Sequence, residues 1–303
     1  RYPQGKMRCP MHLSIGQEAA AIGVGLALNH SDLAVSSHRA HAHYLSKGGD
    51  LKAMLAEIYG KATGCSSGRG GSMHLVDNKV GFRGSTAIVG NSMPIGVGLA
   101  LSLQLEKSSA VSAVFCGDGS LEEGVFYESA NFAAVRKLPV LFVCENNLYS
   151  VYSHLRVRQP EGRKIHKMVE AIGVPTLLVN GNDPQAVYEA ALVAIAHIRD
   201  GRGPFFLELT TYRWREHCGP NYDNDIGYRT EEEFQKWKQK DPIPFFEEKI
   251  LTEGILDELS VKHIEDEIQA EILAAFDFAE RSPFPEPGYA FQGIFAEQTE
   301  TNG

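Results

Sequence analysis

The run between residues 111 and 144 limits the possible folds more than any other part of the chain. Residues 111–116 (VSAVFC) and 140–144 (VLFVC) are continuously apolar, and residues 121–136 between them have the apolar spacing of a helix. Strands that are apolar on both sides are typical of a parallel sheet covered by helices on both faces. Two such strands joined by a helix predict a right-handed crossover and an α/β fold.

The rest of the chain continues this alternation. A strand at 174–179, a helix at 183–199 and a strand at 204–210 are predicted by the same patterns, as are helices over 14–29, 50–59 and 95–105, with Asp50 as an N-cap. Residues 231–280 carry 15 acidic and 5 basic side chains and predict charged, amphipathic helices. We expect an α/β domain over 1–230, a C-terminal helical segment over 231–303 packed on the same domain, and a tail at 282–303 that lies on the surface or across a partner.

Composition excludes several classes of protein. The chain is 43% hydrophobic, which excludes a disordered protein, and its net charge of −9 disfavours binding to nucleic acid. The five cysteines are odd in number, widely spaced and never C-x-x-C, which argues against a disulfide framework or a zinc site. With no visible signal peptide and no apolar run long enough to span a membrane, the sequence predicts a cytoplasmic protein with no membrane association.

Glycine is concentrated in one region, since 13 of the 30 glycines fall in residues 60–124. A stretch rich in glycine and serine is often a flexible linker. Met73, His74, Ile88, Val89 and Met93 interrupt this one, however, and a linker has no need of them. The pattern favours ordered loops that face a ligand.

The segment Gly117-Asp118-Gly119-Ser120 lies where a buried strand gives way to a helix. Ligands of open α/β sheets bind beyond the carboxyl ends of the strands, and the N-terminus of a helix attracts phosphate. Asp118 places a negative charge at the same point, which is consistent with phosphate only if a cation such as Mg²⁺ lies between them. A tight turn with Asp118 as a helix cap is the alternative.

Asn147 follows the next strand, 29 residues beyond Asp118. One helix and one strand fit that interval, so the two side chains are expected to emerge next to each other from adjacent strand ends. Carboxylate and amide oxygens suit a hard cation. A loop-forming pair, Asn146 and Asn147, is the alternative.

Several longer stretches resemble one known family. GDG followed by NN resembles the diphosphate motif of thiamine-diphosphate enzymes, and most of the chain is similar to the α subunits of 2-oxo acid dehydrogenase E1 components, which include the pyruvate, branched-chain and acetoin dehydrogenases. The similar stretches are HLSIGQEA (12–19), SHRAHAHYL (37–45), GRGGSMH (68–74), AIVGNSMPIG (87–96), GDGSLEEGVFYESANFAAVRKLPVLFVCENNLY (117–149), GPFFLELTTYRW (203–214) and GYRTEEE (227–233).

The resemblance implies a thiamine-diphosphate-binding fold and a set of site residues. Mg²⁺ would be bound by the side chains of Asp118 and Asn147 and by the Tyr149 carbonyl. The cofactor would be contacted by His38, Arg39, Val89, Gly117, Gly119, Ser120 and His217. Catalytic roles would fall to His217 and Arg213, on a loop (213–227) that we expect to be mobile without cofactor and ordered with it. His41 and His74 are weaker candidates, since either can be a plain hydrogen-bonded histidine.

The sequence also departs from the family pattern. His38 stands where those relatives usually have tyrosine, and Ala87 replaces a more usual glycine. Cys218 and Asp225-Ile226-Gly227 stand where mitochondrial relatives carry regulatory serines, so control by a kinase at those positions is not expected.

The activity implied is oxidative decarboxylation of a 2-oxo acid, or cleavage of acetoin, with acyl transfer to a lipoyl group on an E2 acyltransferase. In this family a β subunit supplies the glutamate that faces the pyrimidine ring, which implies an α₂β₂ assembly. One alternative is the N-terminal half of a transketolase-like enzyme, and another is a catalytically silent structural or regulatory subunit. A dinucleotide-binding protein is disfavoured because no G-x-G-x-x-G follows a strand.

Overall fold

A computed structural model describes residues 1–7 and 9–293 and confirms the α/β fold. Its main element is a six-stranded sheet in the order β2-β1-β3-β4-β8-β7, in which every neighbouring pair is parallel. A separate antiparallel pair, β5 and β6, follows the sheet's β4 strand. The strands are β1 (Leu33–Ser36), β2 (Phe82–Ser85), β3 (Ser112–Gly117), β4 (Val140–Asn146), β5 (Tyr149–Ser150), β6 (Ser153–His154), β7 (Thr176–Asn180) and β8 (Phe205–Thr210).

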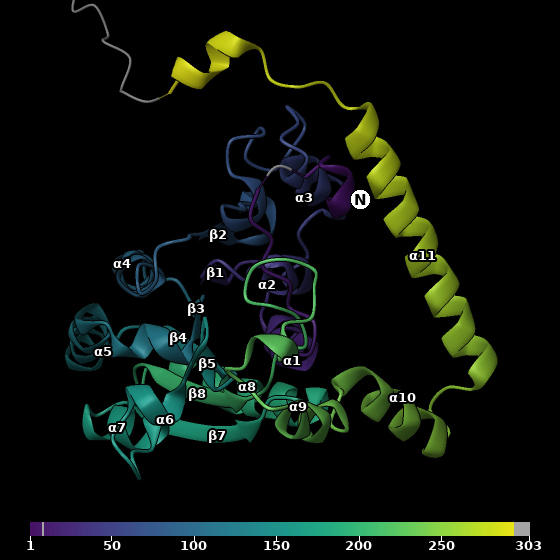
Figure 1. Ribbon diagram of the computed structural model, residues 1–303. Coiled ribbons are helices and arrows are strands. Elements are labelled where there is room, and N and C mark those ends of the chain that lie inside the picture. Colours follow the sequence, from purple (N-terminus) through teal and green to yellow (C-terminus); the bar gives the residue numbers. More distant parts are fainter. Residues whose placement is uncertain (8, 294–303) are drawn as a thin grey trace, which may run out of the picture.

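Helices cover both faces of the sheet because the central strands are apolar on both sides (Figure 1). In β3, Ala113 and Phe115 contribute to one hydrophobic cluster, whereas Val114 and Cys116 contribute to the other. The first cluster includes α1 (Glu18–Ala27), α3 (Leu51–Ile58) and α8 (Pro184–Arg199). The second includes α4 (Ser92–Leu105), α5 (Gly124–Arg136) and α7 (Ile165–Ala171). Two short helices, α2 (His41–Ser46) and α6 (Leu155–Arg158), lie near strand ends.

The acidic C-terminal region is helical, as predicted. It forms α9 (Glu231–Lys238), α10 (Pro242–Thr252) and α11 (Glu258–Arg281). Figure 1 shows α11 as a long helix that runs from α10 to α3, where its residues Ala275 and Ala279 are buried in the first cluster. Within the described residues, none of the helices has both the length and the apolar character that a membrane crossing needs.

Several predicted boundaries move. The helix expected over 14–29 is limited to α1, and the helix expected over 121–136 begins only at Gly124 because a 3₁₀ turn, Asp118–Glu122, precedes it. The sequence patterns miss β1 and β2, which are only four residues each. Residues 294–303 of the predicted tail lie outside the described residues. The division at residue 230 stays a prediction.

The glycine-rich region is ordered rather than a flexible linker, and a buried carboxylate explains why. Glu57 of α3 is 0% exposed. Its two oxygens accept backbone N–H groups of Ser66 (2.8 Å), Gly68 (2.8 Å), Gly70 (2.6 Å) and Gly71 (3.1 Å). One side chain therefore satisfies four donors of a loop that has little regular structure of its own.

Glu57→Gln should lower the free energy of unfolding by about 3 kcal/mol. The amide keeps the shape, but its NH₂ group cannot accept the N–H groups that one carboxylate oxygen now accepts, so buried donors are left without partners. Urea unfolding measures this loss, and Glu265→Gln on the exposed side of α11 is the control. Equal unfolding midpoints for the two variants would show that Glu57 does not hold the loop.

Candidate active site

The ends of β3 and β4 bring the two predicted metal ligands to the same edge of the sheet. The strands are neighbours, with Gly117 paired to Glu145. Asp118 and Asn147 follow these paired positions and are 1% and 7% exposed. The predicted neighbouring emergence from adjacent parallel strands is therefore confirmed, while ligation of a metal by these two groups stays a prediction.

Asp118 is a buried carboxylate with a cationic partner. It forms an ion pair with Arg158, which also pairs with Glu122. Burial raises the pKa of Asp118, and the Arg158 charge opposes that rise. The position thus already compensates the negative charge of Asp118 with a positive one. Sequence reasoning missed Arg158 because it lies 40 residues away, in a segment with no recognisable motif.

The turn after Asp118 places its backbone close to β5. A Cβ atom on Gly119 would lie 2.7 Å from the Ser150 hydroxyl oxygen, so any larger residue there would require Ser150 to move. Gly119 and the buried Ser120 belong to the 3₁₀ turn rather than to the first turn of α5, which corrects the expectation that they form the N-terminus of that helix. Any backbone N–H groups offered to an anion here come from this turn.

A network of buried hydrogen bonds holds the Asn147 side chain in place. Its amide nitrogen donates to Gln17 Oε1 (2.9 Å), and its Oδ1 accepts the Tyr149 N–H (3.0 Å). Gln17 in turn donates to Glu145 (2.8 Å), and His43 Nε2 lies 2.8 Å from the other Glu145 oxygen. A glutamate at the end of an otherwise apolar strand is the sequence signal that could have revealed this network.

The Tyr149 side chain points into a separate aromatic cluster. Its hydroxyl donates to Glu233 (2.7 Å), as does that of Tyr212 (2.9 Å). Trp214 and Phe234 complete the cluster. The ring therefore anchors α9 and the loop after β8, which leaves only main-chain groups of Tyr149 for the predicted role.

Arg39 is buried rather than a solvated surface residue. It is 5% exposed and donates to the carbonyl oxygens of Leu13 (2.5 Å) and His217 (3.2 Å). These contacts bring the predicted cofactor-binding residues His38, Arg39 and His217 together. Val89 is 44% exposed in the loop before α4. His41 pairs with the Ser72 hydroxyl (2.7 Å), in line with the simpler interpretation of that histidine.

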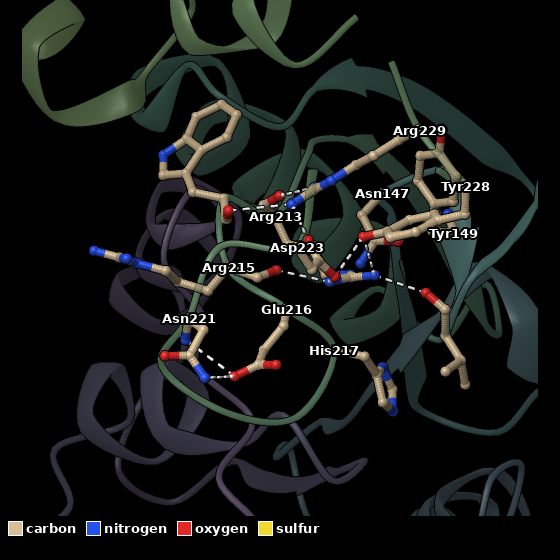
Figure 2. A network of polar contacts seen from close by, with 12 residues as sticks. Asn147, Tyr149, Arg213, Arg215, Glu216, His217, Asn221, Asp223, Tyr228 and Arg229 are labelled. Carbon is tan, nitrogen blue, oxygen red and sulfur yellow. Dashed lines mark hydrogen bonds and ion pairs between the residues drawn. The ribbon is translucent and has the colours of Figure 1, made fainter. Parts of the chain in front are cut away.

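The loop after β8 has a buried base and a hydrogen-bonded tip (Figure 2). Asp223 at the base accepts hydrogen bonds from Arg229 (2.5 Å) and Tyr228 (2.8 Å) and lies 3.6 Å from Arg213. At the tip, the Glu216 carboxylate accepts from the backbone N–H (3.0 Å) and side chain (2.9 Å) of Asn221.

Trp214 at the base of the loop is 1% exposed and packs in the aromatic cluster with Tyr212 and Phe234, whereas the expected mobility of the loop stays a prediction. The guanidinium of Arg213 donates hydrogen bonds to the carbonyl oxygens of Val151 (2.6 Å) and Arg215 (2.7 Å) and to the Tyr228 hydroxyl (3.0 Å). The guanidinium of Arg213 therefore holds the loop in place, and its predicted catalytic role stays a prediction. Figure 2 shows the His217 ring turned away from this network.

Arg39→Lys should weaken binding of a diphosphate by about 1–3 kcal/mol, or roughly 5- to 150-fold in Kd, because lysine keeps the charge but loses the fork geometry of the guanidinium. Calorimetric titration with thiamine diphosphate measures the change. Turnover at saturating cofactor should fall much less than affinity. Unaltered affinity would remove Arg39 from the binding site.

Comparison with known proteins agrees with this geometry. The family model described as "Dehydrogenase E1 component" matches residues 1–288. The chain is 35% identical over 294 residues to the pyruvate dehydrogenase E1 component subunit alpha of Rickettsia felis, covering 97% of this chain and 89% of the relative. The corresponding protein of Zymomonas mobilis is 37% identical over 276 residues, covering 90% and 77% of the two chains.

A third relative, the chloroplastic pyruvate dehydrogenase E1 component subunit alpha-3 of Oryza sativa, is 37% identical over 307 residues and covers 98% and 71% of the two chains. The chain therefore belongs to the dehydrogenase E1 component family, as an E1 α protein of the thiamine-diphosphate-dependent 2-oxo acid dehydrogenases.

Proposed function

We propose that this chain binds the diphosphate end of thiamine diphosphate through Mg²⁺, that it completes its active site with a β subunit in an α₂β₂ assembly, and that the enzyme decarboxylates a 2-oxo acid. The observation that carries the proposal is the placement of Asp118 and Asn147 at the ends of two adjacent parallel strands. The same region holds the 3₁₀ turn Asp118–Glu122, and Arg39 is a buried arginine.

The residues at the strand ends fit a hard cation. Asp118 would supply a carboxylate oxygen, Asn147 its amide oxygen and Tyr149 its carbonyl, which are the ligand types that Mg²⁺ prefers next to phosphate. Asp118 is buried, and an ionised carboxylate removed from water requires a positive charge beside it; Arg158 has that role in this structure, and Mg²⁺ would share it with Arg158. Phosphate and Mg²⁺ together would supply a balanced set of charges at the same point.

The groups around Arg39 fit the anion. A guanidinium can bind two phosphate oxygens at once, and Arg39 is held in place by its bonds to two carbonyls. Gly117 would approach the diphosphate from the end of β3, and Gly119 and Ser120 from the 3₁₀ turn. His38 and His217 would approach it from the side of Arg39. Val89 would offer backbone contacts to the aminopyrimidine ring.

This chain's residues would orient the reaction rather than perform its electronic steps. When bound, the cofactor supplies the stabilisation of negative charge that decarboxylation of a 2-oxo acid requires. His217 would close over the cofactor on a loop that Arg213 holds at its base, excluding water and hydrogen-bonding the substrate. The acyl unit would then pass to a lipoyl group on an E2 acyltransferase.

Pyruvate is the first substrate to test, because the three relatives carry pyruvate dehydrogenase in their names. We propose a 2-oxo acid, or acetoin, as the substrate class. The loop that would meet the substrate carries Cys218 and Asp225-Ile226-Gly227 at positions of family divergence, so branched 2-oxo acids belong in the same assay.

The test is an assay of the α/β complex with Mg²⁺, thiamine diphosphate and a redox dye as electron acceptor. Decarboxylation of one or more 2-oxo acids, or cleavage of acetoin, is expected, with no transfer of a ketol unit from ketose phosphates. Turnover of ketose phosphates alone would instead support a transketolase-like enzyme. Failure of the complex to bind thiamine diphosphate would indicate a silent subunit.

A further inference from the structure

Three histidines from distant parts of the chain meet beside Arg39. His12 precedes α1, His38 follows β1, and His217 lies on the loop after β8. Their ring centroids are 4.5 Å apart for His12 and His38, 4.9 Å for His12 and His217, and 5.2 Å for His38 and His217. One nitrogen of each ring lies within 4.8 Å of one nitrogen of each of the others, so the three converge on one point.

The polar atoms of this cluster lack protein partners. His12 is 6% exposed, and its Nδ1 is buried with no hydrogen bond. Among the described residues, the rings of His38 and His217 also form no hydrogen bond to another protein group. A buried polar atom without a partner is costly, and this applies to the Nδ1 of His12, whereas His38 and His217 are half-buried. The unpartnered Nδ1 and the convergence of the three rings on one point together indicate a binding site for a ligand.

Charged groups decide which kind of ligand fits. The charge of Arg39 acts on all three rings, that of Arg213 on His12 and His217, and that of His41 on His12. Asp223 balances the charge of Arg213, whereas Arg39 forms no ion pair in the described part of the chain. Burial lowers the pKa of Arg39, and the negative charge of Glu145 opposes that effect only in part. Glu145 is itself hydrogen-bonded to Gln17 and paired with His43. A metal cation would be repelled here, and an anion would be attracted.

The protonation state of the rings follows from the same surroundings. Burial, with the nearby cationic side chains, lowers the pKa of each of the three histidines to about 3. The rings are therefore neutral at physiological pH, and each carries a single N–H. An anion between the rings would raise their pKa values, against the effects of burial and of the cationic side chains. It stabilises the protonated ring and accepts a hydrogen bond from its second N–H.

We propose that His12, His38 and His217, together with Arg39, form an anion-binding cluster that takes up protons when the diphosphate of the cofactor binds. The inference rests on the proposed function and adds to it a coupling between pH and cofactor affinity. A group whose pKa is higher in the bound state binds a proton on complex formation, so affinity falls as pH rises between the free and bound pKa values. Above the bound pKa the dependence ends.

The experiment is calorimetric titration of the α/β complex with thiamine diphosphate and Mg²⁺ at pH 6.5 and 7.5. At each pH it is run in two buffers of different protonation enthalpy, which gives the number of protons taken up. The variant is His38→Tyr, with His38→Gln in case the first does not fold, and the control is His197→Gln on α8, remote from the cluster. Protons taken up or released by the cofactor itself are the same for the wild type and each variant. The difference in proton uptake between these proteins therefore reports on His38.

We expect the wild type and His197→Gln to take up roughly 0.5–1 proton more per cofactor than the His38 variants. Their affinity should fall correspondingly more steeply with pH, by up to about tenfold per unit for one proton. Tight binding with equal proton counts in all proteins would overturn the proton coupling and leave the proposed function intact. Absence of cofactor binding would overturn both, and Zn²⁺ bound at one per chain and lost in His38→Gln would show that the cluster is a metal site instead.

Discussion

The purified chain alone is expected to decarboxylate no 2-oxo acid, even with saturating thiamine diphosphate and Mg²⁺. In the proposed function, the groups at the ends of β3 and β4 bind only the diphosphate end of the cofactor. A carboxylate that faces the pyrimidine ring is the other requirement for activation of the cofactor in this family, and we expect the β subunit to supply it. Activity should appear when a β subunit is added.

Three internal glutamates could in principle take that role, and the structure argues against each. Glu18 bonds to the backbone N–H of Gly16 (2.9 Å) at the start of α1 and lines an apolar cavity with α8 and α10. Glu123 and Glu128 are exposed at the start and on the outer side of α5. None of the three has a polar contact with the groups around Arg39 or Asp118.

Exposed apolar side chains on two neighbouring helices support the need for a partner. They occur on the loop before α4 and along α4 and α5, and comprise Ile88 (66% exposed), Val89 (44%), Ile95 (45%), Leu105 (72%), Phe132 (43%) and Val135 (72%). Exposed large apolar groups on adjacent elements are typical of protein interfaces. We expect the β subunit to cover part of this surface.

The measurement compares release of CO₂ by the α chain, by the β subunit and by their mixture at equal site concentrations. Only the mixture should exceed background, and its activity should rise to a plateau at equal amounts of α and β. Steady turnover by an α preparation shown to contain no β subunit would contradict the shared site. A complete site would then have to exist within this chain.

The sequence predicts the centre of the fold better than its edges, for a physical reason. β3 and β4 lie in the middle of the sheet, where both faces of a strand are buried, and their residues 113–116 and 140–144 are all apolar. β1 and β2 have four residues each, and β2 (FRGS) contains an exposed arginine and a glycine. Such short segments carry too little pattern to be separated from loops.

The candidate site also has a part that the sequence predicts and a part that it does not. Asp118 and Asn147 could be predicted because strand order and helix length fix where two successive strand ends lie. The convergence of His12, His38 and His217 depends on how the loop after β8 returns to the N-terminal segment, and no local pattern contains that information. Trp214 was assigned to a mobile loop because only tertiary contacts with Tyr212 and Phe234 bury it.

Asp118→Asn should abolish cofactor-dependent activity while the protein stays folded. The amide preserves the shape of the side chain but removes the negative charge that Mg²⁺ would bind. A loss of about 4 kcal/mol in binding and positioning of the diphosphate corresponds to roughly a thousandfold loss of activity. The fold should survive, because Arg158 keeps its ion pair with Glu122 and the backbone of the turn is unchanged.

Asp32→Asn provides the matched control. Asp32 is also buried and forms an ion pair with an arginine, Arg199 (2.6 Å). It lies immediately before the amino end of β1, whereas the proposed site lies beyond the carboxyl ends of the strands. Its carboxylate accepts the backbone N–H groups of Asn29 (2.7 Å) and Val111 (2.8 Å). This variant should lose roughly 2–4 kcal/mol of unfolding free energy and retain its activity per folded molecule. Asp118→Asn should show the reverse pattern, with activity lost and the urea midpoint little changed. If both variants lose stability and keep their activity, Asp118 is a structural carboxylate, and Mg²⁺ is bound elsewhere.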